Sequence, residues 1–269
     1  MLRIVPLALV LAAATTSTAA AQLGSALART VPFHVAPVPF GPGEVLRYKV
    51  DWGIFSAGEG RLEIAEHLDT LRGVPTYRIG FTVKGRVLFY KVDDYWQSWL
   101  SAEHLVSLRF DQKQQEGSYK RHRIVDFFPA EGRWDQLNHK DEGVLPSPDP
   151  LDDIAFLYFI RTLPLKVGEQ YTYNRYWKDE GNPVIIKVLR RERIKVDGGE
   201  FDTIVVQPII RTRGIFSEGG EAEVFLTDDP QRLVVKLTAK MSIGTLRLSL
   251  AGYTPGQALT YVPRVGDAR

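Results

Sequence analysis

The sequence predicts a mainly β protein, built as a large curved antiparallel sheet or a partly open β-barrel with one helix packed against it. Three observations predict this class. Apolar and polar residues alternate along most of the chain, turn-forming residues separate the alternating segments, and a single segment near residues 150–163 has a helical pattern instead. Short connections imply antiparallel neighbours, and a sheet of ten or more strands tends to curl or close.

The first predicted strand, residues 44–52, shows the alternation most clearly. Leu46, Tyr48, Val50 and Trp52 fall on one face, and charged residues fall on the other. The same alternation recurs at residues 62–64, 76–84, 106–111, 224–226, 233–239 and 246–250. It is less regular at residues 117–128, 169–177 and 183–196. Turn signals rich in Gly, Asp and Pro lie between them. The pattern therefore predicts many half-buried strands.

The predicted helix has both a start and a stop signal. Asp149 can cap it, Pro150 suits the first helical position, and Asp152 and Asp153 lie at the positive end of the helix dipole. Pro164 ends it. Between these limits, apolar residues recur at helical spacing. We expect this helix to lie against the sheet.

The N-terminal residues predict export. Arg3, an apolar run from Ile4 to Ala14, and a small-residue end at Ala19-Ala20-Ala21 have the form of a secretory signal peptide over residues 1–21. A proline-rich extended leader is expected at 22–39, a single β domain at 40–253 and a mobile tail at 254–269. The mature protein is then expected to be soluble and periplasmic or extracellular.

Composition excludes several classes. The chain lacks cysteine, so no disulfide supports the fold, and Gln22 follows the predicted cleavage site where a lipoprotein would need cysteine. No second apolar run is long enough for a transmembrane segment. A net charge of +2 argues against a dedicated nucleic-acid surface. Basic residues do concentrate at 113–123 and 187–195, where solvated sheet faces are the simpler interpretation.

No catalytic or metal-binding constellation is visible. The five histidines form no H-x-H or H-x-x-x-H pair. Adjacent acids on a strand, such as Asp93 and Asp94, point to opposite faces, and the other two pairs are explained by the helix dipole or by a turn. The sequence therefore predicts no cofactor, no metal and, on balance, no enzyme. Aromatic residues are the most suggestive set, because an apolar ring with a polar tip suits sugars or acyl chains. The predicted ligand-binding residues are Tyr48, Trp52, Phe81, Trp96, Trp99 and Tyr173.

Three sequence blocks together resemble a known family. They are Phe40-Gly41-Pro42-Gly43-Glu44 with the strand up to Gly53, Asp149-Pro150-Leu151-Asp152 with Leu163-Pro164-Leu165, and Thr227-Asp228-Asp229-Pro230-Gln231-Arg232-Leu233 with Ile243-Gly244. In this order they resemble domain-of-unknown-function family 3108, over about residues 40–253. The resemblance implies an exported bacterial protein with a curved antiparallel sheet, loosely similar to periplasmic lipoprotein carriers. It implies no activity and no catalytic residues.

These observations lead to three hypotheses for function. The first is an exported non-enzymatic protein that binds a hydrophobic or amphipathic envelope ligand, a lipid or a glycan, in a concave sheet. The second is a structural module that docks an envelope protein partner through its sheet edges. The third is a polysaccharide or peptidoglycan hydrolase, which would need two carboxylates converging in a groove.

Overall fold

A computed structural model describes residues 38–259, apart from residues 88, 213–215, 217–220 and 241–243. The predicted signal peptide, most of the leader and most of the tail lie outside these residues. The strands are β1 (Val45–Trp52), β2 (Phe55–Ile64), β3 (Asp69–Leu71), β4 (Val74–Val87), β5 (Tyr90–Ser101), β6 (Ser107–Glu116), β7 (Tyr119–Phe128), β8 (Arg133–Gln136), β9 (Asp141–Val144), β10 (Gln170–Tyr173), β11 (Val184–Val196), β12 (Gly199–Ile209), β13 (Glu223–Thr227), β14 (Val234–Lys240) and β15 (Thr245–Thr254). The helix is α2 (Asp153–Arg161), and two 3₁₀ turns are η1 (Pro129–Glu131) and η2 (Asp179–Gly181).

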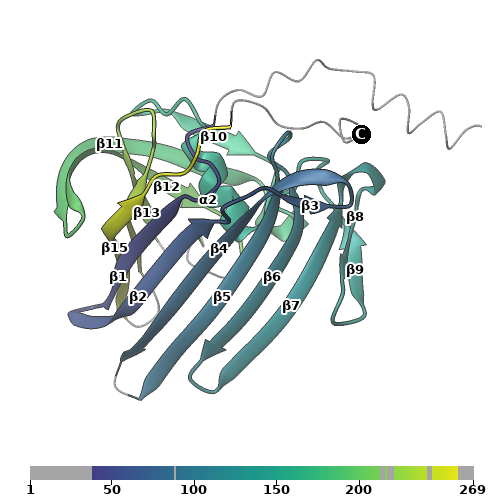
Figure 1. The fold of residues 1–269 in the computed structure, drawn as a ribbon, viewed down its shortest axis with the longest axis horizontal. Helices are drawn as coiled ribbons and strands as arrows, with labels where there is room; N and C mark the ends of the chain where they lie inside the picture. Colours follow the sequence, from purple (N-terminus) through teal and green to yellow (C-terminus); the bar gives the residue numbers. More distant parts are fainter. Residues whose placement is uncertain (1–37, 88, 213–215, 217–220, 241–243, 260–269) are drawn as a thin grey trace, which may run out of the picture. The chain divides into compact units, whose positions relative to one another are not determined.

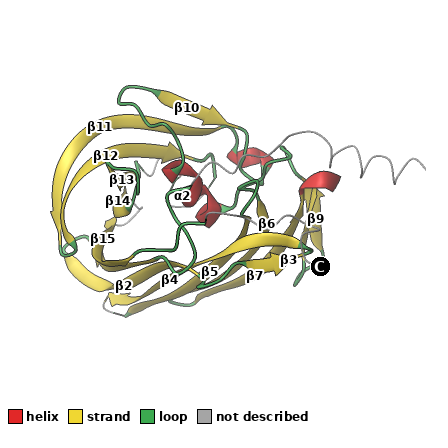
Figure 2. Ribbon diagram, turned by 45° about the horizontal axis from the view of Figure 1, so that its top comes forward, coloured by secondary structure: helices red, strands yellow, loops and turns green. Residues whose placement is uncertain are grey.

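All fifteen strands belong to one antiparallel sheet. Their order is β10-β11-β12-β13-β14-β15-β1-β2-β4-β5-β6-β7-β8-β9, and β3 pairs only with β4. The two end strands, β9 and β10, do not pair with each other, so the sheet curls without closing (Figure 1). Seen from another side, the sheet bends around α2, with β10–β13 on one side of the helix and β2–β7 on the other (Figure 2). The predicted fold class is confirmed.

The predicted alternation produces the inner and outer faces of this sheet. In β1, Leu46, Tyr48 and Val50 are buried, whereas Arg47 and Lys49 are exposed. Because successive side chains of a strand point to opposite faces, the apolar set of each strand meets the concave side. The inner residues of neighbouring strands pack into one hydrophobic core that also contains α2.

Helix α2 begins three residues later than the cap at Asp149 would place it. Its N-cap is Asp152, whose Oδ1 accepts hydrogen bonds from the backbone N–H groups of Ile154 and Ala155, both at 2.9 Å. The preceding residues have other backbone partners. The carbonyl of Pro150 accepts from Ser107 N at 2.8 Å, and Leu151 forms a parallel bridge with Tyr176. These tertiary bonds hold residues 150–151 in an extended conformation.

The helix is buried on all sides rather than along one stripe. Every residue from Ile154 to Arg161 is buried. A helix that is apolar around its whole circumference belongs inside a core. The concave side of the sheet is therefore filled at the level of α2, with side chains of the helix packed against β4 and β5.

Irregular segments cover the gap between the two ends of the sheet. The Leu151–Tyr176 bridge links the segment before α2 to the segment after β10. Trp177 then packs its ring edge-on against Phe127 of β7 and Trp134 of β8, with ring centroids 5.6 and 5.2 Å apart. Aromatic pairs of this geometry add to the stability gained by burial. No backbone ladder joins β9 to β10, but side chains of the segment after β10 pack across the gap between them.

An ion pair anchors the far end of the helix. Arg161 donates to both carboxylate oxygens of Glu44, at 2.6 and 2.8 Å, and its side chain is fully buried. The same guanidinium donates to the carbonyls of Pro39 and Gln231, at 3.0 and 3.2 Å. Burial alone would lower the pKa of Arg161, but the hydrogen bonds and charge of Glu44 hold it above its usual value. Arg161 therefore joins α2, as a cation, to two distant chain segments: the one before β1 and the one before β14.

Replacing the two candidate caps separately tests the start of the helix. Asp152→Ala should lower the free energy of unfolding by about 2–4 kcal/mol, because it removes the cap and leaves the hydroxyls of Ser98 and Ser107 buried without their acceptor. Asp149→Ala is the control, because the Asp149 side chain is exposed. Urea denaturation measures both. An equal loss of unfolding free energy in the two variants would contradict the assignment of Asp152 as the N-cap.

The buried ion pair makes a second prediction for the same measurement. Arg161→Met should destabilise the fold by about 3–5 kcal/mol, because Glu44 would remain buried without a counter-charge. The double variant Arg161→Met/Glu44→Leu should recover part of this loss, since no unpaired charge remains. The Pro39 and Gln231 carbonyls still lose a donor, so recovery stays incomplete. A double variant less stable than Arg161→Met would contradict this interpretation.

Candidate functional site

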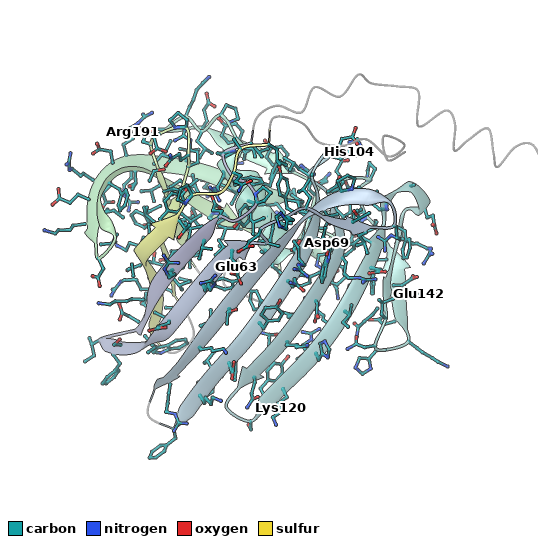
Figure 3. All side chains as sticks on the ribbon, viewed as in Figure 1. Glu63, Asp69, His104, Lys120, Glu142 and Arg191 are labelled. Carbon is teal, nitrogen blue, oxygen red and sulfur yellow. The ribbon has the colours of Figure 1, made fainter. Side chains whose placement is uncertain are left out.

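The accessible part of the concave face lies between α2 and the turns at one end of the sheet. Beside the helix, inward-facing residues such as Tyr77, Ile79 and Leu100 are fully buried. Farther along the same strands, Phe81, Val83 and Trp96 are only half-buried although they face the same way. Figure 3 marks this end of the sheet by Lys120, at the turn between β6 and β7. The change in exposure locates where a ligand can approach the inner face.

Five residues here form what we call the inner-face cluster: Phe81, Asp94, Trp96, Gln112 and Arg123. Strand register places four of them in one row, with Phe81 opposite Trp96, Trp96 opposite Gln112, and Gln112 opposite Arg123. The rings of Phe81 and Trp96 lie 5.9 Å apart. Asp94 is two residues before Trp96 on β5 and therefore on the same face. The row passes from aromatic to polar to cationic across the sheet.

Three polar atoms in this row have no hydrogen-bond partner among the residues that the structure describes. They are Nε1 of Trp96, Oε1 of Gln112 and Nε of Arg123, and each is buried. Buried polar groups in folded proteins are nearly always hydrogen-bonded, to protein or to ordered water. Three unused groups on adjacent strands therefore leave hydrogen-bonding capacity beside the half-buried aromatic rings.

Arg123 connects the cluster to the start of α2. Its guanidinium carbon lies 5.1 Å from the ring centroid of Trp177 and 5.6 Å from that of Phe110. One of its terminal nitrogens is 3.9 Å from a carboxylate oxygen of Asp153. Burial lowers the pKa of Arg123, and the negative charge of Asp153 opposes this effect. A guanidinium stays charged even so, because its ordinary pKa is far above neutrality.

Asp94 is the titrating member of the cluster. The pKa of Asp94 is raised to about 7, chiefly by burial and also by the neighbouring Glu116 and Asp93, while a hydrogen bond from Gln115 N at 2.9 Å acts in the opposite direction. Near neutral pH this carboxyl group therefore exists in both protonation states. It can accept or donate a hydrogen bond at the inner face.

Two neighbouring acids have structural partners. Burial raises the pKa of Asp152 to about 6, and the hydroxyls of Ser98 and Ser107 donate to its Oδ2 at 2.6 and 2.7 Å. With Oδ1 capping the helix, both of its oxygens are occupied. Burial also raises the pKa of Asp153, which accepts from the Tyr176 hydroxyl at 3.2 Å. Asp152 therefore belongs to the helix cap rather than to a reacting pair.

The structure separates most of the aromatic residues predicted as ligand-binding. Phe81 and Trp96 meet on the inner face. Tyr48 is buried and donates to the carbonyl of Val234 at 2.8 Å, and Trp52 is half-buried at the end of the same inner face. Trp99 lies on the outer face of β5, where its Nε1 donates to Asp69 at 3.0 Å. Tyr173 is on the end strand β10, against Phe159.

Sequence reasoning missed the polar members of the cluster. Asp94, Gln112 and Arg123 occupy inward-facing positions that apolar residues hold elsewhere on these strands. The available signal was a break in the apolar pattern: in β6 the inward-facing residues change from apolar Leu108 and Phe110 to polar Gln112. Such interruptions become informative only when the register shows that they coincide on neighbouring strands.

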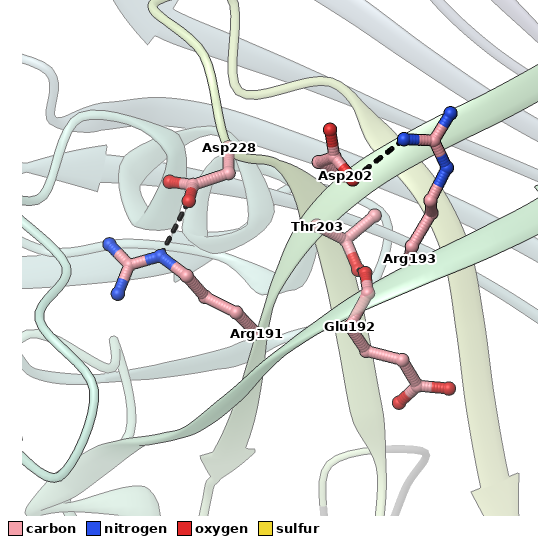
Figure 4. Close-up of a pocket in the computed structure, with 6 residues that line it drawn as sticks. All are labelled: Arg191, Glu192, Arg193, Asp202, Thr203 and Asp228. Carbon is pink, nitrogen blue, oxygen red and sulfur yellow. Dashed lines mark hydrogen bonds and ion pairs between the residues drawn. The ribbon is translucent and has the colours of Figure 1, made fainter.

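A separate pocket lies on β11 and β12 (Figure 4). It is lined by Arg191, Glu192, Arg193, Asp202, Thr203 and Asp228. Arg191 pairs with Asp228 at 2.6 Å, and Arg193 with Asp202 at 3.6 Å. Glu192 pairs with Arg190 outside the pocket, at 2.9 Å. Because these charges already neutralise one another, we do not assign a ligand to this pocket.

Metal sites and membrane spans can be assessed for residues 38–259, apart from the undescribed gaps. Within that part of the chain, no group of three or more His, Asp or Glu side chains is arranged to hold a metal ion. No helix there has the length and hydrophobicity needed to cross a bilayer.

Comparison with protein-family models identifies the family of this chain. The model of the family described as "Protein of unknown function (DUF3108)" matches residues 47–251. The chain belongs to this family. No curated protein matches the DUF3108 chain.

One solved structure has a similar fold. The DUF3108 chain resembles a β-barrel-like protein of unknown-function family DUF1849 from Brucella abortus, with a TM-score of 0.55, 11% identity, and coverage of 82% of this chain and 100% of that one. A structure described as a "putative lipoprotein" from Parabacteroides distasonis ATCC 8503 matches with a TM-score of 0.36, 10% identity, and coverage of 81% and 99%. At such identities the first likeness concerns the fold alone, and the second carries no weight.

The raised pKa of Asp94 makes stability depend on pH. A carboxyl group with a raised pKa binds its proton more tightly in the folded state, so the free energy of unfolding falls as pH rises from about 4 to about 7. Asp94→Asn, which resembles the protonated form, should reduce this fall. Urea denaturation across that pH range measures it. Asp93→Asn is the control, since Asp93 faces the other way and pairs with Lys91. Equal slopes in the wild type and Asp94→Asn would contradict the assignment.

Proposed function

We propose that this chain is an exported, non-enzymatic protein that binds an amphipathic envelope ligand against the inner-face cluster. The acyl part of the ligand would contact Phe81 and Trp96, and its polar head group would reach Gln112 and Arg123. The observation that carries this proposal is the coincidence of half-buried rings with three unused polar atoms in one row. Export is supported by the signal-peptide pattern of residues 1–21.

The chemistry of the row favours an acylated molecule over a bare glycan. Aromatic and aliphatic surface on Phe81, Val83 and Trp96 gains free energy by covering apolar ligand atoms. A buried guanidinium close to this surface suits an anionic head group, because charge-assisted hydrogen bonds are the strong ones. A neutral glycan would bring no opposite charge to Arg123, whose ion pair with Asp153 is long, at 3.9 Å.

The position of α2 limits the size of the ligand. The helix and its packing partners fill the concave side next to Leu46, Leu62 and Tyr77. A ligand therefore lies along the inner face toward the turns rather than through the middle of the sheet. Single-chain amphiphiles fit this arrangement better than molecules with several acyl chains.

Binding of lysophosphatidylglycerol, an anionic single-chain lipid, tests the proposal. Trp96→Leu should weaken binding about tenfold or more, because it removes ring area that would cover the acyl chain. Trp99→Leu is the matched control, since Trp99 lies on the same strand but on the outer face. Titration followed by native mass spectrometry measures both. The absence of any complex, or equal weakening by the two variants, would overturn the proposal.

Head-group selectivity tests the role of Arg123. Arg123→Gln should lose the preference for lysophosphatidylglycerol over the zwitterionic lysophosphatidylcholine while retaining affinity for the acyl chain. The reason is that the substitution removes the buried cation but leaves Phe81 and Trp96 in place. Thermal unfolding of each variant verifies that the fold persists. Unchanged head-group selectivity in Arg123→Gln would show that Arg123 does not contact the head group.

A further inference from the structure

Exposed apolar side chains concentrate at one end of the sheet. The described residues include eight large apolar side chains that are exposed, and six of them lie at or next to turns between consecutive strands. These six are Ile54, Phe55, Phe89, Tyr90, Tyr119 and Leu137. Ile54 is 93% exposed and Phe89 is 100% exposed, so neither contributes to the core.

Topology places all these turns at the same end. Each adjacent pair from β1 to β9 is antiparallel, so the β1–β2, β4–β5, β6–β7 and β8–β9 turns share one end of the sheet. Figure 1 shows the ends of β4, β5, β6 and β7 lying side by side here. A hydrogen bond from the Tyr90 hydroxyl to Glu116, at 3.3 Å, links the β4–β5 and β6–β7 turns. We call the six exposed apolar side chains at these four turns the apolar rim.

Cations surround the middle of the rim. Lys84, Arg86, Lys113, Lys120 and Arg121 are exposed on the β4–β5 and β6–β7 hairpins, and none of them forms an ion pair with a described residue. Figure 3 shows Lys120 at the tip of its hairpin. Residues 84–94 and 113–122 carry six Lys or Arg against three Asp or Glu. This section of the rim is therefore cationic as well as apolar.

We propose that the apolar rim docks on an anionic lipid surface. Its side chains would enter the interfacial layer, while the neighbouring cations would attract acidic head groups. Tyrosine, present at positions 90 and 119, suits this layer because its ring is apolar and its hydroxyl is polar. The site is separate from the inner-face cluster and does not depend on the proposed ligand.

The composition of the rim favours lipid over a protein partner. Protein interfaces bury a contiguous apolar centre that is depleted in lysine. Here the apolar side chains lie at separate turns, and Lys120 lies next to Tyr119 at one of them. Separate projecting tips with flanking cations can each enter a fluid head-group layer without matching a shaped surface.

Vesicle sedimentation tests the rim with the purified full chain. Vesicles of equal parts phosphatidylglycerol and phosphatidylcholine should bind the protein, and phosphatidylcholine vesicles should bind it much less. Phe89→Ser should weaken binding to the anionic vesicles about tenfold or more, because a fully exposed ring is lost. Lys120→Gln/Arg121→Gln should weaken it similarly and reduce its sensitivity to salt.

Val144→Ser is the matched control. Val144 is 79% exposed, but it lies at the end of β9 away from the rim. All variants carry the same N-terminal residues, so any contribution of that segment to binding is common to them. Equal loss in Val144→Ser and Phe89→Ser, or no binding by the wild type, would overturn the proposal. So would a dimer in lipid-free solution that Phe89→Ser converts to monomer, because the rim would then bind a second copy.

Discussion

The structure depends on enclosing a helix that has no solvent-facing side. Such a helix can be buried only if the polar groups at its two ends find partners inside the protein. At its start, Asp152 accepts hydrogen bonds from two backbone N–H groups of the first turn and from two serine hydroxyls of β5 and β6. At its end, Arg161 is neutralised by Glu44, just before β1. These two sites tie strands that are distant in sequence to the same helix, and the sheet curls around it.

The enclosed helix also determines where function can be located. Because α2 fills the concave side beside its own strands, the inward-facing residues there are buried, whereas Phe81 and Trp96, farther toward the turns, are half-buried. The inner-face cluster lies at this boundary, and Arg123 is shared between the cluster and the packing around Trp177. The same ends of β4–β7 that carry the cluster also carry the apolar rim. Ligand binding and surface attachment are therefore proposed for one end of one sheet.

The DUF3108 family and the likeness to a DUF1849 protein identify an architecture, with no activity attached to it. Function must therefore be inferred from side chains. The contrast between two polar regions is instructive here. On β11 and β12, Arg191 and Arg193 face acids that neutralise them, whereas on β5–β7 three buried polar atoms lack partners. Unused hydrogen-bonding capacity next to half-buried aromatic rings therefore separates the inner-face cluster from the β11–β12 pocket.

The sequence by itself determined the alternation of strands such as β1, the single helix before Pro164 and the family. These follow from local periodicity and turn chemistry. It did not determine that Asp152, rather than Asp149, caps the helix, because the backbone bonds of Pro150 and Leu151 come from β6 and from Tyr176. Nor did it predict that Trp96, Gln112 and Arg123 lie in one row across the sheet. It also did not predict that Trp96 belongs to the inner-face cluster whereas Trp99 bonds to Asp69 on the outer face. Only the register between strands decides which residues become neighbours, and register is a property of the whole sheet.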